Sequence, residues 1–400
     1  MTAMTTDVCV IGGGPAGLTV ALELARAGVD VVVVEQTGGF QRSFRGESIS
    51  PDAVLVLDRL KVLDRIRDEG CLTTRRMEIS ESGRVVLSAE FKDYRYEHRF
   101  PMELPQSVLL NILAEEAGAL DTFTMVRRSS AVELIESDGA VRGVRVAGRG
   151  GDHEITAHLV IGADGRYSKV LDMSGLAYQR LPLDRDVVWL KLPLPPEWDT
   201  ETYRVRINGN RHGLFIPTYP DLVRVGFNIP KGGLKELRAK GIGELHRRIE
   251  ELAPELAGLL RSEVTNWSDT TVLDIFTSVV PTWWRPGLVL IGDAAHTLSP
   301  ILGQGVNHAL IDAVTLAPMV ADAVGTARLD GALAAFQAAR DADVRRSRAL
   351  QLRQERMFTF GSRPAVLLRS TLYRALNSST ALRQRVLADA YFRMQKREAG

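Results

Sequence analysis

One stretch near the start of the chain constrains its fold more than any other feature. Residues 7–35 read "DVCVIGGGPAGLTVALELARAGVDVVVVE", which is an apolar strand, a glycine-rich turn, a helical segment that stops at Gly28 and a second apolar strand. This order predicts a βαβ unit, and such units build parallel sheets with helices on their faces. We therefore expect an α/β fold with a Rossmann-like domain.

The glycine spacing in this turn has a chemical meaning. Gly12 permits the tight turn, Gly14 lets the backbone approach a pyrophosphate, and Gly17 lets the helix lie close to the strand. The N-terminus of the helix offers free N–H groups to phosphates. Glu35 ends the second strand, where a carboxylate can accept hydrogen bonds from a ribose. The residues predicted to bind a dinucleotide here are Gly12, Gly14, Pro15, Ala16, Gly17 and Glu35.

Composition excludes several other classes of protein. The 400 residues carry a formal net charge of +1, which provides no overall field for nucleic acid. There are two cysteines, and Cys9 lies inside the first apolar strand, so a disulfide framework is not expected. The seven histidines form no Cys/His pattern of the metal-ligand type, and we predict no metal site. With no basic leader before Asp7, the chain is expected to be cytoplasmic.

Two later motifs repeat the pattern of an apolar strand that ends in Gly and Asp. "HLVIGADG" ends at Asp164-Gly165, and "GLVLIGDAAH" contains Gly292-Asp293. Together with "GGGPAG", "FRGESISP" and "LPQSVLLNIL", these motifs resemble the class A flavoprotein monooxygenases of the para-hydroxybenzoate hydroxylase-like family. The resemblance spans the whole chain, and three motifs in this order are highly specific.

The resemblance implies an FAD site and assigns residues to it. Asp293 would accept a hydrogen bond from the ribityl chain, and Arg45, Gln106 and Asp164 would contact the ribose, ribityl or phosphate groups. The stretch from Pro300 to Asn307 would pass under the isoalloxazine ring, which small residues permit. The helix that begins there would aim its N–H groups at the flavin N1/C2 carbonyl region. Beyond the first motif, the predicted FAD residues are Arg45, Gln106, Asp164, Gly292, Asp293, Pro300, Gly303, Gly305, Val306 and Asn307. Read without the family, Arg45 is a surface cation, Gln106 a helix cap and Asp164 a turn carboxylate.

The same resemblance implies a reaction. NADH or NADPH would reduce the FAD, O2 would add at C4a, and the hydroperoxide would hydroxylate or epoxidise an electron-rich small molecule such as an aromatic or polyketide-like ring. Arg166 would serve NAD(P)H use and the Pro300 carbonyl would polarise the leaving hydroxyl, although either residue could be a plain surface or turn residue. No second glycine motif follows a strand, so NAD(P)H would dock transiently. One rival is a reductase of the geranylgeranyl reductase type, and another is a flavin-bound redox sensor without turnover. A flavin halogenase is disfavoured, because its tryptophan signature is missing.

The rest of the chain predicts a discontinuous arrangement. The FAD-binding domain would comprise 1–75, 106–177 and 280–340, and the alternating segments in 76–105 and 178–279 would form a mostly antiparallel substrate sheet. The candidate substrate-facing residues are Trp189, Phe215, Tyr219 and Phe227, although a shift of one residue in register would invert the faces.

The remaining segment, 341–400, is predicted to be helical and is strongly basic. From Arg345 to Gly400 there are 13 basic and 3 acidic residues. These helices could simply pack on the more acidic remainder. Alternatively, they could form a weak docking face for an anionic membrane or an acidic carrier protein.

Overall fold

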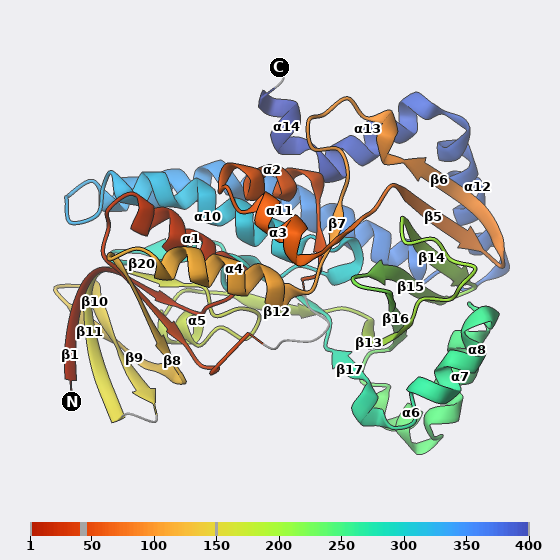
Figure 1. The fold of residues 1–400 in the computed structure, drawn as a ribbon, viewed down its shortest axis with the longest axis horizontal. Coiled ribbons are helices and arrows are strands. Elements are labelled where there is room, and N and C mark those ends of the chain that lie inside the picture. The colour runs from red at the N-terminus through yellow and green to blue at the C-terminus, as the bar shows by residue number, and fades with distance from the viewer. Residues whose placement is uncertain (1, 41–45, 149–150, 399–400) are drawn as a thin grey trace.

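A mixed sheet of eight strands forms one end of the molecule (Figure 1). The computed structural model describes residues 2–40, 46–148 and 151–398. The central strands are parallel to their neighbours, in the order β20-β11-β1-β2-β8. Their bounds are β1 (Thr2–Ile11), β2 (Val31–Glu35), β8 (Phe123–Arg127), β11 (Gly151–Gly162) and β20 (Leu288–Leu290). Antiparallel strands extend it: β9 (Ser129–Ser137), β10 (Ala140–Gly148) and β19 (Trp284–Arg285).

Helices cover this sheet because its strands are apolar on both faces. The crossover helix α1 (Pro15–Arg26) contacts α4 (Gln106–Gly118) and α10 (Gly305–Ala321). Apolar side chains of α1 and α10 share one core with the central strands. The shorter helices near this layer are α2 (Pro51–Arg59), α3 (Leu63–Glu69), α5 (Lys169–Met173) and α9 (Asp293–His296). The predicted βαβ unit is therefore present, and it places three glycine turns near the carboxyl ends of β1, β11 and β20.

A second sheet of seven strands lies at the other end (Figure 1). Its order is β17-β13-β16-β15-β14-β5-β6, and every pair is antiparallel except β14 with β5. The bounds are β5 (Arg76–Glu81), β6 (Arg84–Glu90), β13 (Arg185–Pro193), β14 (Thr202–Asn208), β15 (Arg211–Thr218), β16 (Leu222–Pro230) and β17 (Thr271–Leu273). One face packs against the helices α6 (Leu234–Ala239), α7 (Ile242–Glu250) and α8 (Ala257–Glu263). The mostly antiparallel sheet expected for the substrate region is confirmed.

Small elements connect the two sheets. A three-stranded sheet, β3-β7-β4, joins β3 (Ser48–Ile49), β7 (Met102–Glu103) and β4 (Leu72–Thr73). A separate pair joins β12 (Gln179–Pro182) to β18 (Phe276–Val279). The structure also contains short 3-10 helices: η1 (Phe91–Asp93), η2 (Pro254–Leu256), η3 (Trp267–Asp269) and η4 (Pro300–Leu302).

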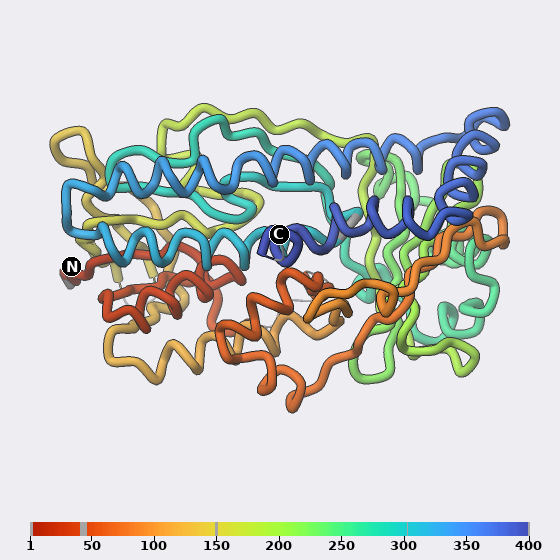
Figure 2. Tube along the Cα trace, turned by 90° about the horizontal axis from the view of Figure 1, so that it is seen from above, coloured from red at the N-terminus to blue at the C-terminus, as the bar shows by residue number. Residues whose placement is uncertain are grey.

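The C-terminal helices tie both ends together. α11 (Leu329–Phe358) runs along the length of the molecule, and the chain then returns through α12 (Arg363–Ser378) and α13 (Thr380–Tyr391) to α14 (Arg393–Glu398) (Figure 2). The side chain of Arg369 is fully buried and bonds both carboxylate oxygens of Glu81 at 2.7 and 2.8 Å, which anchors α12 to the second sheet. No helix in the described ranges is long and apolar enough to cross a bilayer.

One predicted boundary conflicts with this architecture. The division at residue 340/341 falls inside α11, a continuous helix of 30 residues. Nothing at that point breaks the helix, because the segment "AARDADVRRS" contains neither proline nor glycine. The other proposed domain limits remain predictions.

Candidate functional site

The first glycine turn is shaped by contacts that leave no room for side chains. Gly12 has φ +109°, and a Cβ on it would lie 2.5 Å from the carbonyl oxygen of Ala163. A Cβ on Gly17 would lie 1.9 Å from the Gly12 carbonyl oxygen, so this glycine lets α1 approach β1. Gly14 is the N-cap of α1, and no side chain caps that end. Pro15 and Ala16 begin this helix, and the free backbone N–H groups of its first turn are thus suited to bind a phosphate.

Glu35 holds this turn from the end of β2. Its Oε2 accepts a hydrogen bond from the Gly13 N–H at 2.8 Å, and its Oε1 accepts from the N–H and hydroxyl of Thr37 at 2.8 and 2.7 Å. The side chain is buried, at 1% exposure. Its predicted contact with a ribose remains a prediction, and the structure adds a role in shaping the loop.

Asp164 lies against the same turn but is engaged within the protein. A Cβ on Gly12 would lie 2.9 Å from the Asp164 Cα, so the first two glycine motifs touch. Its carboxylate accepts hydrogen bonds from the Ser168 hydroxyl at 2.5 Å and from the Lys169 and Val170 N–H groups at 2.7 and 3.1 Å. Burial raises the pKa of Asp164, although these bonds oppose the shift. The structure therefore supports the turn-carboxylate alternative, and the contact with FAD remains a prediction.

The third motif is held from behind by a buried carboxylate. Gly292 has φ +59°, and its N–H donates to Asp312 Oδ2 at 2.9 Å. The same oxygen bonds His296 Nε2 at 2.6 Å, and Asp312 Oδ1 accepts from Arg340 Nε at 2.7 Å. Burial acts to raise the pKa of Asp312, but His296 and Arg340 outweigh it and hold that pKa below its usual range. His296 is thus a structural partner.

Sequence reasoning missed Asp312 and Arg340. An acidic residue on the buried face of the apolar stretch "VNHALIDAV" was an available signal, since such a group needs a partner.

The loop from Pro300 to Asn307 keeps a space clear of side chains. A Cβ on Gly303 would find Ser48 Cβ, 3.5 Å away, as its nearest neighbour, and one on Gly305 would find Asp293 Oδ1 at 3.7 Å. Gly303 has φ +61°, which favours glycine, but Gly305 has no such backbone reason. Contacts within the described part of the chain therefore do not require glycine at position 305, and the predicted flat ring over the loop would require it. This cradle fits FAD.

The other predicted FAD residues gather around this loop. The Asn307 side chain accepts from the Ser50 N–H and donates to the Gly303 carbonyl, both at 2.8 Å. A Cβ on Gly46 would lie 2.2 Å from Gln106 Nε2 and 3.4 Å from Val306 Cβ, so these residues are neighbours. The Pro300 carbonyl accepts a bond from the Gly303 N–H at 2.9 Å. Arg45 lies outside the described residues.

Trp189 reaches the site from the second sheet. Its ring lies across the Gly226 backbone, where a Cβ would come within 2.6 Å of it. Trp189 also lines a cavity of about 10 Å³, enough for one water molecule. That cavity lies between the sheet and the Pro300 turn, and its lining includes Arg185, His212, Leu214, Asn228, Pro300, Ile301 and Glu355. The indole N–H of Trp189 has no hydrogen-bond partner among the described residues.

Phe215 and Phe227 do not face this cavity. In antiparallel pairs Trp189 lies opposite Gly226, whereas Phe227 lies opposite Val188 and Phe215 opposite Val225. Because side chains alternate along a strand, both phenylalanines point to the other face. There they pack in the core beneath α7 and α8. The substrate-facing prediction for these two residues is therefore wrong.

Tyr219 lies away from the cavity, and Arg166 is engaged in contacts within the protein. Tyr219 is 37% exposed and packs over Gly70, and it does not line the cavity. Arg166 donates to the Asp274 carbonyl at 2.8 Å and stacks on the Phe276 ring, with 4.7 Å from its Cζ to the centroid. These contacts join the second motif to the strand β18. The role of Arg166 in NAD(P)H use remains a prediction.

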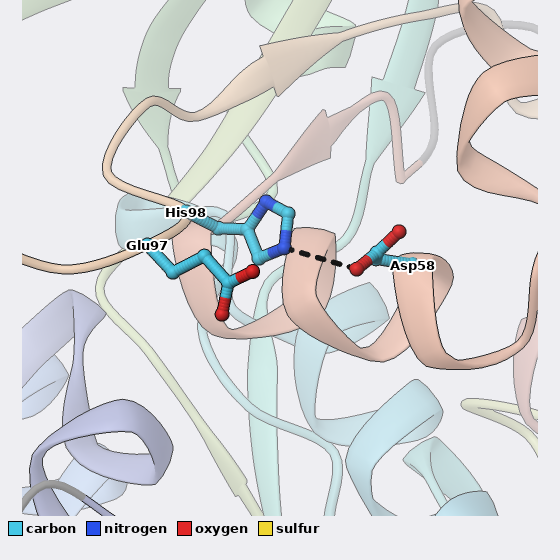
Figure 3. A group of neighbouring side chains, drawn as sticks. All are labelled: Asp58, Glu97 and His98. Carbon is cyan, nitrogen blue, oxygen red and sulfur yellow. Dashed lines mark ion pairs between the residues drawn. The ribbon is translucent and has the colours of Figure 1, made fainter.

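A group of potential metal ligands lies outside this loop. Asp58, Glu97 and His98 are the one such group in the described ranges, with His98 Nε2 3.4 Å from Asp58 Oδ2 (Figure 3). Exposed acidic clusters of this kind are common without metal, and we assign it no function.

Comparison with known proteins identifies the family. Residues 5–349 match the FAD binding domain family. The 6-methylpretetramide 4-monooxygenase of Streptomyces rimosus is 35% identical over 388 residues, which cover 96% of this chain and 92% of that protein. The crystal structure of p-nitrophenol 4-monooxygenase from Pseudomonas putida DLL-E4 shares the fold, with TM-score 0.82, 20% identity and coverage of 97% and 98% of the two chains.

A more distant relative has a reductase name. The digeranylgeranylglycerophospholipid reductase of Methanothrix thermoacetophila is 27% identical over 342 residues, covering 81% of this chain and 79% of that protein. The family match, the monooxygenase relative and the glycine cradle agree. The chain belongs to the FAD binding domain family and is a class A flavoprotein monooxygenase.

Proposed function

We propose that this enzyme uses NADH or NADPH and O2 to hydroxylate or epoxidise an electron-rich aromatic or polyketide-like ring. The observation that carries the proposal is that Trp189 lies on the sheet face that meets the Pro300 turn, with both lining the same small cavity. An aromatic wall facing the flavin cradle suits a flat ring. The 35% identity to 6-methylpretetramide 4-monooxygenase supports a fused polyketide ring as the first substrate to try.

Separate groups of residues would bind FAD and position the substrate. Gly12, Gly14 and the N-terminus of α1 would bind the pyrophosphate of FAD, and Glu35 would bind its ribose. Asp293 would hold the ribityl chain, and the N-terminus of α10 would stabilise negative charge on the pyrimidine side of the ring. Bound FAD would supply electron transfer from NAD(P)H and the activation of O2. Trp189 would orient the substrate and, together with Ile301, exclude water.

The decisive experiment combines reduction with isotope transfer. Purified enzyme loaded with FAD is mixed anaerobically with NADH or NADPH, with and without 6-methylpretetramide, and bleaching of the flavin is followed. The mixture is then exposed to ¹⁸O₂. We expect substrate-accelerated bleaching and one ¹⁸O atom in the product. NAD(P)H consumption that yields only hydrogen peroxide with every ring tested would contradict the proposal.

The reductase relative supports one alternative function. In that case the enzyme would saturate an isoprenoid double bond, and O2 would not be consumed in proportion to product. Incubation with NADH or NADPH and a geranylgeranyl lipid in the absence of O2, followed by mass spectrometry, separates the two functions. A gain of two hydrogens, with one NAD(P)H oxidised, supports the reductase, whereas no change in the lipid supports the monooxygenase.

We also propose that the basic C-terminal helices make a weak contact with an anionic surface. Leu367, Leu368 and Leu372 of α12 are exposed beside basic residues. Part of the positive charge is used internally, since Arg369 bonds Glu81 and Arg397 bonds Asp343. Any such contact is therefore expected to be weak and sensitive to salt.

A further inference from the structure

A buried polar cluster lies beside Trp189 on the sheet face that borders the site. It combines two carboxylates, two cations and two hydroxyls, and we call it the Glu103 cluster. Its members come from β3, β7, β13, β15, β16 and the residue before β3, and they are Glu47, Ser48, Glu103, Lys191, Thr218 and Arg224. Glu47 and Ser48 lie in the "FRGESISP" motif, but no member of the cluster has a role in the proposed function.

Strand register explains how the cluster reaches the site. Lys191 and Arg224 lie opposite each other in the β13–β16 pair, two residues along from the Trp189–Gly226 pair. They therefore share the sheet face that carries Trp189. The Arg224 guanidinium lies 5.4 Å from the centre of the Trp189 ring. The cluster is thus a continuation of the face that meets the flavin loop.

Ser48 is the member closest to the flavin cradle. Its Cβ is the nearest atom to the position of a Cβ on Gly303, at 3.5 Å. Ser48 and Glu103 are paired in the β3–β7 ladder. The Ser48 hydroxyl donates to Glu103 Oε2 at 2.8 Å and accepts from Arg224 Nη2 at 2.8 Å. One lone pair of the hydroxyl remains to accept a proton from a molecule in the site.

The two carboxylates differ in their surroundings. Glu47 is held by three donors, because it accepts from Lys191 Nζ at 3.0 Å and Thr218 Oγ1 at 3.2 Å and lies 3.4 Å from Arg224 Nη1. Glu103 has Ser48 and Arg224 Nη2, the latter at 3.1 Å, and its side chain is 3% exposed. Glu47 therefore has three donors to compensate a carboxylate, whereas Glu103 has two. Glu103 is the member of the pair that we expect to accept a proton.

Resting on the function proposed above, we propose that Ser48 and Glu103 form a proton-transfer pair for a substrate with an acidic hydroxyl, either a phenol or an enol. The substrate O–H gives its proton to Ser48 Oγ, and the Ser48 hydroxyl proton passes to Glu103 Oε2. The substrate becomes a phenolate or enolate, and Glu103 becomes a neutral acid. The anion is more electron-rich at carbon, which suits attack on an electrophilic oxygen. Glu103 acts through Ser48 and is a positioning residue.

The electrostatics of the cluster support this role. Burial raises the pKa of Glu103 to about 8, although the Arg224 charge and the Ser48 hydrogen bond oppose the rise and Glu47 adds to it. A proton acceptor works best when its pKa lies near the working pH. The ionisable groups that bear on Glu103 from neighbouring elements are Glu47, Arg224, Tyr203, Tyr391 and, through Glu47, Lys191.

The first test reads the proton on Glu103 without turnover. Infrared spectra of the FAD-loaded enzyme are recorded from pH 5 to pH 10 for wild type and for Glu103→Gln. We expect a protonated-carboxyl band that titrates near the pKa of about 8 and is absent from the variant. A wild-type spectrum in which no carboxyl band titrates above pH 6, or one that Glu103→Gln leaves unchanged, overturns the proposal even if hydroxylation occurs.

The second test reads the transfer itself. The visible spectrum of bound 1,8-dihydroxyanthraquinone and the turnover of 6-methylpretetramide are followed against pH. In wild type we expect ionisation of the bound dye and turnover to rise together with pH toward about 8. In Glu103→Gln and in Ser48→Ala both rises are lost, and turnover at pH 7 falls about 100-fold, which is typical of lost acid–base catalysis.

Two controls keep the tests interpretable. Glu201→Gln changes an exposed carboxylate that pairs with exposed Arg75, and it should leave every readout unchanged. FAD content should match wild type in all three variants, and so should thermal unfolding at pH 5, where Glu103 of the wild type is protonated. If well-folded, FAD-loaded Glu103→Gln and Ser48→Ala retain the wild-type pH profile, the proton-transfer pair is refuted. A wild type that titrates as expected but hydroxylates no ring instead refutes the proposed function.

Discussion

Asp312 accepts a hydrogen bond from the backbone N–H of Gly292 at 2.9 Å, and this contact joins the buried face of α10 to the third glycine motif. Asp312 is completely buried, and its two oxygens also bond His296 and Arg340. A buried charge with this many partners holds a loop in one arrangement. The glycine loop that is proposed to hold the flavin is thus supported from inside the protein.

We expect Asp312→Asn to lower both stability and FAD affinity. The change removes the closer of two carboxylates from buried Arg340, with Asp343 remaining at 3.6 Å, and the loss of such a buried pair costs at most about 3–5 kcal/mol. Thermal unfolding of the apoprotein and fluorescence titration with FAD measure the two effects. Asp322→Asn, at the exposed end of the same helix, is the matched control and should change neither. Unaltered FAD affinity in Asp312→Asn would argue against support of the loop by this residue.

We expect Gly305→Ala to weaken FAD binding without destabilising the apoprotein. Among the described residues beyond its own turn of helix, the atom nearest to a Cβ there is Asp293 Oδ1 at 3.7 Å, and the Cβ would enter the space assigned to the ring. Overpacking of about 1–3 kcal/mol corresponds to a loss of FAD affinity of roughly tenfold to a hundredfold. Gly331→Ala, which has open space in α11, is the control and should leave FAD binding intact. Equal FAD affinity in the two variants would contradict the placement of the flavin ring over this loop.

Trp189→Phe and Phe215→Ala should separate the two faces of the second sheet. Trp189→Phe should raise KM for an aromatic substrate while the melting temperature stays close to wild type. Phe215→Ala should instead destabilise the fold by about 3–5 kcal/mol, because it empties part of the core beneath α7 and α8. Steady-state kinetics and chemical denaturation give the two quantities. The reverse pattern would show that the sheet faces are assigned incorrectly.

Glu103 predicts a pH dependence of stability with a definite sign. Its pKa in the folded protein is raised from 4.5 to about 8, so the folded state holds the proton more tightly than the unfolded state. The contribution of Glu103 to the free energy of unfolding is therefore fully present below pH 4.5, and it is lost as pH rises through 8. The melting temperature of Glu103→Gln minus that of wild type should therefore be larger at pH 9 than at pH 5. A difference in melting temperature that does not vary with pH would contradict this.

The basic C-terminal helices predict salt-dependent binding to anionic vesicles. Sedimentation with phosphatidylserine-containing liposomes should capture a fraction of the protein at low salt and release it at about 0.5 M salt, where charges are screened within a few ångströms. Leu367→Ser combined with Leu368→Ser should reduce the captured fraction, because both side chains are exposed on α12. Failure to sediment at any salt concentration would exclude the membrane contact.

The local parts of this site could be predicted from the sequence because their chemistry is local. Gly12 and Gly17 act within one turn and helix, and Gly292 and Gly303 adopt positive φ values that few other residues tolerate. Such requirements are visible in short stretches, so the βαβ unit, the flavin loop and the family followed from residue order alone. The antiparallel second sheet followed in the same way from its alternating strands.

Only the tertiary structure decided which side chains meet in the site. Alternation groups Trp189 with Lys191 and separates both from Val188, but it does not say which group faces the core, and Phe215 and Phe227 were assigned to the wrong face for that reason. Arg224 and Glu103 are 121 positions apart and meet only because β7 and β16 are brought together. Contacts between charges far apart in the sequence depend on packing and produce no periodic pattern in it. Turns and strands do produce such local patterns.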